Sequence, residues 1–229
     1  MIKKILPVLK FSSYLLWVPF ILTVSFEIIT FSDWIYEFNW EKNNISYKTN
    51  LSKTDLNEAS DQIKDYFKND QEKINIVINR DKSFKLFNQR EIDHMVDVKN
   101  LIKSTLLFEK ISLFIIFFYL VLFSYKKKIR RLSSIIIRII HRSLLIWSGI
   151  ILIIIFGMII NFNASFVLFH RIFFRNDLWI LDPRNDYLLI MFPESFFLEI
   201  SITIIGLFAI INFLFYIIAW IFNKKLNPR

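Results

Sequence analysis

Four long apolar runs dominate this sequence and limit the folds that it can adopt. A hydrocarbon core about 30 Å thick takes roughly 20 helical residues to cross, because a helix rises about 1.5 Å per residue. The last two runs are long enough by themselves, and the first two become so when they extend past Glu27 and Lys110. We therefore predict an α-helical integral membrane protein with four transmembrane helices. The uncharged runs are residues 11–26, 111–125, 143–169 and 200–223, and the predicted helices are residues 11–31, 106–125, 144–161 and 193–223.

Basic residues predict how these helices are oriented. Three segments that flank the helices contain Lys and Arg but no Asp or Glu, and the positive-inside rule places such segments in the cytoplasm. The net charge of +9 is therefore explained by topology better than by nucleic-acid binding. The predicted order is residues 1–31 (cytoplasmic N-terminus and first helix), 32–105 (outside), 106–125 (second helix), 126–143 (basic cytoplasmic loop), 144–161 (third helix), 162–192 (outside), 193–223 (fourth helix) and 224–229 (cytoplasmic tail).

The basic start of the chain, followed by an apolar run, is also typical of a secretory signal peptide. The run is long, however, and no small-residue cleavage site follows it, so an uncleaved anchor is expected. The sequence has no cysteine, which excludes disulfides, thiolate nucleophiles and zinc–thiolate sites.

The outer segment, residues 32–105, is predicted to form a small α+β structure. Residues 55–68 place apolar side chains at helical spacing with charges opposite, which indicates an amphipathic helix with Thr54 as its N-cap. Residues 74–79 and 84–86 alternate apolar and polar side chains on either side of turn residues, a pattern typical of a β-hairpin. An aromatic group follows the first helix and is typical of the membrane–water interface; it comprises Trp34, Tyr36, Phe38 and Trp40.

A polar stretch between the last two apolar runs, residues 169–197, contains groups able to do chemistry. It includes His170, and His94 lies just before the second helix, so both are predicted on the outer side. Polar groups at a membrane boundary are costly unless something uses them, and we interpret the two histidines as a shared site. Composition alone favours the alternative that they are structural or interfacial histidines.

The neighbours of His94 and His170 each have a plainer explanation beside the functional one. Glu91 and Asp97 lie one helical turn from His94, so they are candidates to fix its tautomer, or they belong to a solvated helix face. Phenylalanines around His170 predict a short helix in the interface, from which Arg171 reaches lipid phosphates. The remaining candidates, which turn formation or the interface also explains, are Asn176, Asp177, Trp179 and Asp182.

Three charged residues are predicted about one turn inside the outer hydrocarbon boundary: Glu27, Glu109 and Lys110. Such groups face the interior of a helix bundle, where they pair or line a cavity, and a cavity there opens at the depth of lipid esters. An unbroken helix from residue 94 to residue 125 would carry His94 on the order of 18 Å above this boundary. We therefore predict a break in the helix near Asp97 to Asn100.

Several familiar signatures are missing from the sequence. It contains no GxSxG nucleophile elbow, no phosphate-binding glycine loop and no HExxH zinc helix. Two histidines with Asp177 or Asp182 match no specific ligand spacing, so we predict no metal. The spacing of the glycines predicts no dimerisation motif, and the oligomeric state stays open.

Two stretches resemble the bacterial lipoprotein intramolecular transacylases, four-helix membrane proteins that make lyso-form lipoproteins. The first is F-x-x-x-E-I-x-H-M-x-D-V-K, from Phe87 to Lys99. The second is F-H-x-x-F-F-x-N-D-x-W-x-L-D-P, from Phe169 to Pro183, followed by M-F-P-E-x-F-F, from Met191 to Phe197. The predicted helix number and orientation agree with this resemblance along the chain.

The resemblance implies a reaction, a place and partners. The sn-2 acyl chain of a lipoprotein's diacylglyceryl cysteine moves to the α-amino group of the same cysteine, which leaves an N-acyl, S-monoacylglyceryl terminus. Because both reacting groups are on one molecule, no acyl-enzyme and no cofactor are required. The implied place is the bacterial cell membrane with the site facing outside, and the partners are diacylglyceryl-modified lipoproteins and membrane lipids.

The resemblance also implies roles for the candidate residues. His94 and His170 are the expected acid and base, because an imidazole with a pKa near 6.5 is matched to an α-amino group with a pKa near 8. Asn176 is the expected oxyanion donor or positioning group, Asp97 and Asp177 the orienters, and Trp179 a wall of the acyl groove. The expected supporting residues are Arg171, Asp182, Glu27 and Glu109. Two alternatives stay open: an outer-leaflet lipid hydrolase or intermolecular acyltransferase, and a non-enzymatic lipid-sensing protein.

Overall fold

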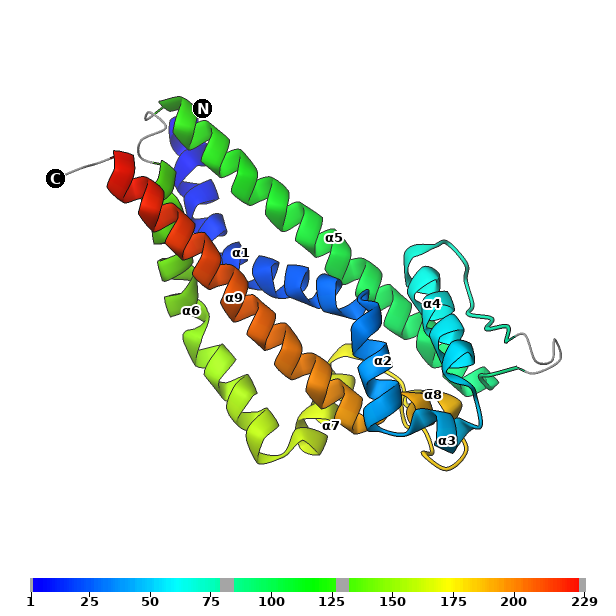
Figure 1. The fold of residues 1–229 in the computed structure, drawn as a ribbon. Helices are drawn as coiled ribbons and strands as arrows, with labels where there is room; N and C mark the ends of the chain where they lie inside the picture. The colour runs from blue at the N-terminus through cyan, green and yellow to red at the C-terminus, as the bar shows by residue number, and fades with distance from the viewer. Residues whose placement is uncertain (1, 79–84, 127–131, 227–229) are drawn as a thin grey trace. The chain divides into compact units, whose positions relative to one another are not determined.

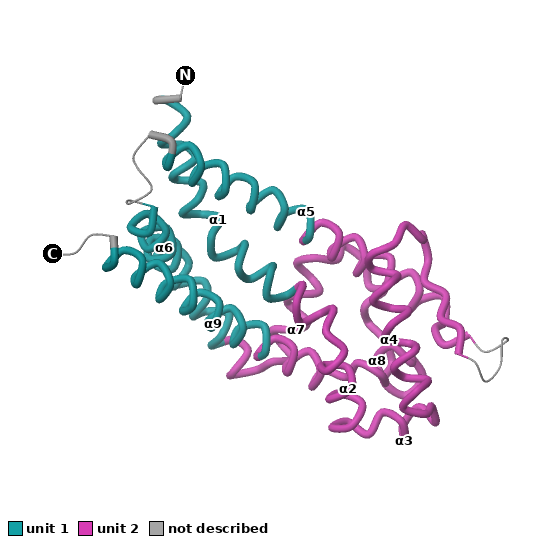
Figure 2. The backbone as a smooth tube through the Cα atoms, turned by 45° about the horizontal axis from the view of Figure 1, so that its top comes forward, with its two compact units in different colours: residues 1–26, 106–156, 203–229 teal, residues 27–105, 157–202 magenta. Residues whose placement is uncertain are grey.

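The described residues of the computed structural model, 2–78, 85–126 and 132–226, form α-helices joined by turns (Figure 1). They fall into two compact units, coloured separately in Figure 2. Unit 1 consists of residues 1–26, 106–156 and 203–229, and unit 2 consists of residues 27–105 and 157–202. The helices are α1 (Ile2–Thr30), α2 (Asp33–Lys42), α3 (Ile45–Thr49), α4 (Lys53–Lys68), α5 (Gln89–Lys126), α6 (Leu132–Ile160), α7 (Phe162–Phe173), α8 (Tyr187–Met191) and α9 (Glu194–Leu226).

Four of these helices are long and apolar enough to cross a membrane: α1, α5, α6 and α9. At about 1.5 Å per residue each exceeds the roughly 30 Å of a hydrocarbon core. The chain is therefore a multi-pass membrane protein, as predicted. The apolar stretches lie within Lys4–Thr30, Gln89–Ser124, Leu132–Ile160 and Glu194–Lys225.

In unit 1, helix α6 compensates for a proline inside α1. Pro19 has no N–H to donate to the carbonyl of Leu15 one turn earlier. The indole nitrogen of Trp147 on α6 donates to that carbonyl instead, at 2.9 Å. The backbone N–H of Val18 donates to the hydroxyl of Ser143 at 3.0 Å. These two bonds let α1 keep a proline within an apolar core, because its freed backbone groups are satisfied by a neighbouring helix.

The core of unit 1 is apolar with one buried amide. Its buried side chains include Trp17, Ile21 and Tyr119. Asn212 on α9 is buried among them, and its side-chain oxygen accepts the indole N–H of Trp17 at 2.9 Å. Its amide nitrogen donates to the carbonyl of Phe208 at 2.8 Å. Both ends of the buried amide are therefore satisfied, which avoids the cost of an unpaired polar group in an apolar interior.

The helix ends beside the basic segments lie together at one end of unit 1. Figures 1 and 2 both place the start of α1, the end of α5, the start of α6 and the end of α9 together there. Helix α6 begins at Leu132, so Arg138, His141 and Arg142 lie on that helix rather than in the loop expected over residues 126–143. The apolar run starting at Ser143 therefore covers only the later part of this helix.

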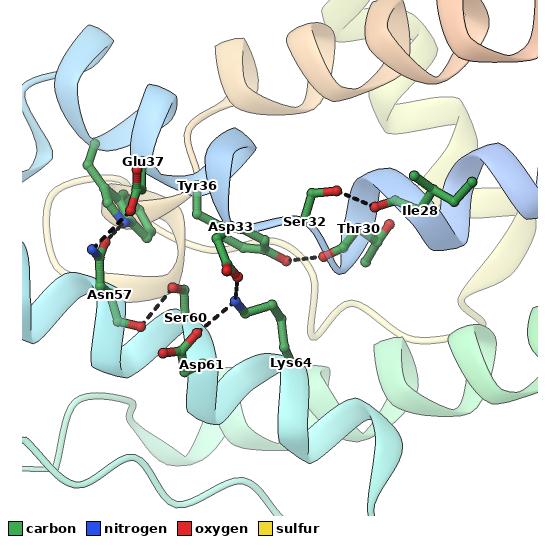
Figure 3. A network of polar contacts seen from close by, with 11 residues as sticks. Ile28, Thr30, Ser32, Asp33, Tyr36, Glu37, Asn57, Ser60, Asp61 and Lys64 are labelled. Carbon is green, nitrogen blue, oxygen red and sulfur yellow. Dashed lines mark hydrogen bonds and ion pairs between the residues drawn. The ribbon is translucent and has the colours of Figure 1, made fainter.

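Unit 2 is built on helix α4, which lies against α2. The ammonium of Lys64 on α4 bonds both Asp33 on α2 and Asp61, and the Lys64–Asp61 separation is 2.7 Å (Figure 3). The hydroxyl of Tyr36 donates to the carbonyl of Thr30 at 2.7 Å, which fixes α2 to the end of α1 within this unit. The predicted amphipathic helix is confirmed, and its apolar face is buried; the face comprises Leu56, Ala59, Ile63, Tyr66 and Phe67.

The predicted N-cap of this helix, Thr54, is wrong. The cap is Ser52, whose hydroxyl accepts the N–H of Asp55 while the carboxylate of Asp55 accepts the N–H of Ser52. This reciprocal capping box satisfies two orphan backbone donors, which no bond from Thr54 alone would do.

The predicted hairpin is absent from the part of the chain that the structure describes. Ile74, Ile76 and Ile78 are buried alternately, as predicted, but residues 74–78 form an extended segment without a strand. Residues 79–84, which include the predicted turn, lie outside the described residues. The alternation therefore arises because one side of this segment packs against the core of unit 2, without pairing to another strand.

The aromatic group at residues 34–40 is only partly an interface belt. Trp34 and Phe38 are exposed, but Tyr36 and Trp40 are buried in unit 2. Their rings pack against Phe192, with centroids 6.0 and 5.4 Å away. These four side chains are two residues apart on helix α2, and two residues turn a helix by about 200°. They therefore point alternately to its outer face and to the core.

The predicted break near residues 97–100 is wrong, because α5 is a continuous helix from Gln89 to Lys126. Lys99, inside the expected break, is buried. Its ammonium donates to the carbonyl of Gln71 at 2.6 Å and to the side chain of Asn69 at 3.2 Å, and it lies 4.0 Å from the ring centroid of Tyr66. These contacts stabilise the helix at the position where a break was expected.

Candidate active site

His94 and His170 meet inside unit 2. His94 lies on α5 and His170 on α7, and their side chains are 6% and 7% exposed. The two ring centroids are 6.1 Å apart, with the ring planes inclined by 36°. Two imidazoles at this distance are within reach of one substrate group, and a proton on one disfavours a proton on the other.

The tautomer of His170 is set by its own helix. Its Nδ1 lies 2.7 Å from the carbonyl oxygen of Phe166, one turn earlier on α7. A carbonyl only accepts, so Nδ1 carries the hydrogen and Nε2 of the neutral ring carries the lone pair. Burial lowers the pKa of His170, and the bond to Phe166 opposes this only in part. The ring is therefore a neutral base at pH 7.

Aromatic rings surround His170 and keep water from it. Trp179 lies beside the imidazole with centroids 4.9 Å apart and planes inclined by 31°. The ring of Phe166 is 4.3 Å away, and that of Phe174 is 5.5 Å away. Trp179 therefore belongs to the wall of the histidine pair and is not an isolated interface residue.

His94 has an unsatisfied nitrogen at this place. Its Nδ1 is buried and has no hydrogen-bond partner among the described residues. The ring of Phe174 meets the imidazole edge to face, with centroids 5.3 Å apart. A buried polar atom without a partner costs free energy, so this nitrogen is open to a group from a bound molecule.

The carboxylates expected to fix the tautomer of His94 have other partners. Asp97 accepts the side-chain amide of Asn176 at 2.8 Å. Glu91 is 1% exposed and accepts two backbone N–H groups, from Asn88 at 2.7 Å and from Leu188 at 2.6 Å. These carboxylates thus position the segments around the histidines.

Asn176 is held in the loop that follows α7. Its side-chain oxygen accepts the N–H of Leu178 at 3.0 Å, and its amide donates one hydrogen to Asp97. The guanidinium of Arg90 on α5 donates to the backbone carbonyl of Asp177, which ties the same loop to α5 a second time. The loop that carries Trp179 is therefore tied to α5 at two successive residues, Asn176 and Asp177, shortly before Trp179.

Three predicted residues lie away from the histidine pair's contacts. The Asp177 side chain is exposed, and so is Arg171 in the last turn of α7. Asp182 is a turn former, because its hydrogen bonds among the described residues stay within residues 182–186. Hydrogen bonds from Arg184 lower the pKa of Asp182 to about 2.

Glu27 and Glu109 belong to different units. Glu27 is half-buried on the part of α1 in unit 2, and Glu109 is half-buried on the part of α5 in unit 1. The cavity expected around them stays a prediction. Among the described residues, no group of three or more His, Asp or Glu side chains is placed to hold a metal ion.

Sequence reasoning missed a clamp at the start of α5. Asn88 and Glu91 form a capping pair, in which the Asn88 side chain accepts the N–H of Glu91 at 3.1 Å and Glu91 accepts the N–H of Asn88. The Asn88 amide also donates to Asp186 at 2.7 Å. The signal was present, since Asn followed three residues later by Glu is a helix-start pattern.

Comparisons with known proteins identify the family and the fold of this chain. A family profile described as lipoprotein intramolecular transacylase Lit matches residues 11–197. No curated protein matches the chain. The solved structure of the membrane integral lipoprotein intramolecular transacylase Lit from Bacillus cereus has a TM-score of 0.80 and 20% identity, covering 97% of this chain and 98% of that one. Structures of the same protein with one histidine replaced by arginine or alanine give TM-scores of 0.74 and 0.75, each at 20% identity and 97% of this chain, covering 94% and 96% of those chains.

The family assignment rests on the profile, which spans most of the sequence, while the solved structures show the shared fold. The chain is an enzyme, an acyltransferase, and it belongs to the lipoprotein intramolecular transacylase family.

Proposed function

We propose that this enzyme moves the sn-2 acyl chain of a lipoprotein's diacylglyceryl cysteine to the α-amino group of the same cysteine. The amine nitrogen attacks the ester carbonyl and forms a C–N bond, and the tetrahedral intermediate collapses by breaking the bond to the glycerol oxygen. The product is an amide plus a free glycerol hydroxyl on the same molecule. Holding both groups at one site supplies much of the rate by proximity.

The observation that carries this proposal is the buried pair of imidazoles 6.1 Å apart. We assign His170 as the base, because its Nε2 lone pair faces away from the Nδ1–H that Phe166 holds. The nitrogen gives its proton to this lone pair as it attacks. The proton then reaches the departing glycerol oxygen through His94, so both rings end the cycle neutral. General acid–base catalysis of this kind contributes on the order of 10²- to 10⁴-fold.

The neighbours of the pair receive matching roles. Asn176 keeps one amide hydrogen beyond the one it donates to Asp97, and that hydrogen is our candidate donor to the developing oxyanion. Asp97 orients Asn176, and Trp179 with Phe174 walls the site against water. Arg171 is exposed for a lipid phosphate, whereas Asp177 and Asp182 shape the loop and its following turn.

The substrate's location follows from the orientation predicted by the basic segments. With those segments in the cytoplasm, the segments that carry His94 (residues 32–105) and His170 (residues 162–192) are on the outside of the cell membrane, where lipoproteins carry their diacylglyceryl group. Glu27 and Glu109 remain our candidates for polar groups at the depth of the ester.

Mass spectrometry of lipoprotein N-termini from cells expressing the chain tests this function. The wild type should give N-acyl, S-monoacylglyceryl termini, and His94→Ala or His170→Ala should abolish them. Lys103→Ala is the matched control, since this exposed residue lies on the same helix as His94 and pairs with Asp70 at 3.0 Å. Release of free fatty acid would indicate a hydrolase, acylation of a second molecule an intermolecular enzyme, and silent histidine variants a non-enzymatic role.

A further inference from the structure

A hollow lies in unit 1, and the proposed reaction does not use it. It has a volume of about 810 Å³ and lies between the first half of α1 and the first half of α6. Lys10 and Tyr14 line it from α1, and Arg138, His141 and Arg142 line it from α6. All five residues belong to one unit, and the bond between Val18 and Ser143 holds the two helices together beside it.

The charge of this hollow is one-sided. Lys10, Arg138 and Arg142 are exposed, and no Asp or Glu lines the hollow. In the described ranges, none of the ion pairs involves these three side chains. The Lys10 ammonium lies 5.7 Å from the ring centroid of Tyr14, which keeps it over the hollow's wall. Three cationic side chains without an acidic partner favour the binding of an anion in this hollow.

The hollow is also amphipathic. Ile137, Leu145 and Ile146 line it together with the cations, and Ser143 begins the apolar run of α6. Arg138 and Arg142 stand one turn apart on the same face of α6, where two planar guanidinium groups can hold one phosphate by paired hydrogen bonds. A phosphate held there would have aliphatic side chains beside it. An inorganic phosphate has no apolar part to pack against them, whereas a phospholipid does.

We propose that this hollow binds the phosphate headgroup of an anionic phospholipid. Its walls match the two halves of such a lipid: the cations take the phosphodiester, and the aliphatic side chains take the glycerol and the first carbons of the acyl chains. Helices α1 and α6, which line it, begin at the same end of unit 1 (Figure 2), and the positive-inside rule places the basic segments beside those helix ends at the cytoplasmic leaflet with its negative surface potential. Basic pockets between membrane helices on that side are common headgroup sites.

Lipid retention measured by native mass spectrometry tests this proposal on the full chain in a neutral detergent. Phosphatidylglycerol should stay bound, whereas phosphatidylcholine, whose headgroup carries a compensating cation, should not. The variant Arg138→Gln/Arg142→Gln should weaken phosphatidylglycerol binding on the order of 30-fold. Each basic residue near an anionic lipid surface raises the affinity roughly fivefold, and the variant lacks two of them. Arg138→Lys/Arg142→Lys keeps the charges and should lose less affinity.

The matched control is Lys224→Gln/Lys225→Gln at the end of α9, which removes the same charge at the same end of unit 1 but outside the hollow. It should bind phosphatidylglycerol as the wild type does. An equal loss in this control would mean that net charge, not the hollow, attracts the lipid, and would overturn the proposal. So would unchanged binding in the arginine-to-glutamine variant, or displacement of the lipid by an equal concentration of inorganic phosphate, which would indicate a free-anion site. The readout does not involve acyl transfer, so it stands apart from the proposed reaction.

Discussion

The carboxylate of Glu91 accepts the backbone N–H of Leu188 at 2.6 Å, and this bond ties the start of the His94 helix to the segment that follows the His170 loop. Glu91 and Leu188 are 97 positions apart in the chain. The second carboxylate oxygen holds the N–H of Asn88. One buried side chain therefore fixes both segments that flank the histidine pair.

Replacing this carboxylate should destabilise unit 2. In Glu91→Gln one of the two N–H donors would face an NH₂ group, and a buried donor without an acceptor costs about 1–3 kcal/mol. Thermal unfolding in detergent measures the change, with Gln89→Ala as the exposed control on the same turn, expected within about 0.5 kcal/mol of the wild type. An unchanged unfolding temperature in Glu91→Gln would show that the bond to Leu188 contributes nothing.

The contact between Asp97 and Asn176 should appear as a coupling in catalysis. Asn176→Ala should lower kcat by about 10²- to 10³-fold if its amide stabilises the oxyanion. Asp97→Ala should lower it less, because that residue acts by orienting Asn176. In the double variant the two losses should not add, and rates with a synthetic lipopeptide measure the coupling. Additive losses would contradict an orienting role for Asp97.

Much of this fold could be predicted from the sequence, because hydrophobic runs of about 20 residues report membrane spans directly. The amphipathic helix ending at Lys68 could also be predicted, because its apolar spacing matches the face that packs in unit 2. The unbroken helix through the polar half of α5 could not be predicted, because hydropathy does not indicate that Lys99 is buried against Tyr66 and bonded to Gln71. A local sequence pattern therefore does not predict structure that depends on contacts between residues far apart in the chain.

The candidate site divides in the same way. The motifs around His94 and His170 predicted that the rings share a site, and the structure places them 6.1 Å apart. The partners of Asp97 and Glu91 could not be predicted, because spacing along one helix does not reveal a loop amide or a backbone N–H from elsewhere. For Asp182 the sequence left a supporting role and turn formation open, and its hydrogen bonds with Asp186, Arg184 and Asn185 are those of a turn.

The stability of the protein should depend on pH through His170. Burial lowers the pKa of His170 below the value of about 6.5 that it has when unfolded, so the unfolded chain binds more protons as the medium becomes acidic. The contribution of the neutral ring is complete above about pH 6.5 and is lost as the pH falls through the lowered pKa. Unfolding midpoints between pH 5 and 7 check this. His170→Gln should flatten that part of the curve, and an equally steep curve in the variant would contradict it.

Trp179 should set the acidic limb of the pH–rate profile. Its ring covers His170 at a centroid distance of 4.9 Å, so Trp179→Ala admits water and should return the pKa of His170 toward its ordinary value. The acidic limb of kcat/KM should then move to higher pH, whereas Trp179→Phe should leave it nearly in place. If Trp179→Ala lowers the rate at every pH without moving the limb, the ring does not control the protonation of His170.

The most direct test of the central claim uses one purified preparation and a synthetic diacylglyceryl lipopeptide whose sn-1 and sn-2 acyl chains differ in isotopic mass. The lipopeptide is mixed with an unlabelled one, and the N-termini are analysed by mass spectrometry. We expect that only the sn-2 label reaches the α-amino group and that no label crosses to the other peptide. His94→Gln and His170→Gln should each abolish transfer while remaining folded. Label exchange between peptides, or full transfer in a variant lacking both imidazoles, would contradict this claim.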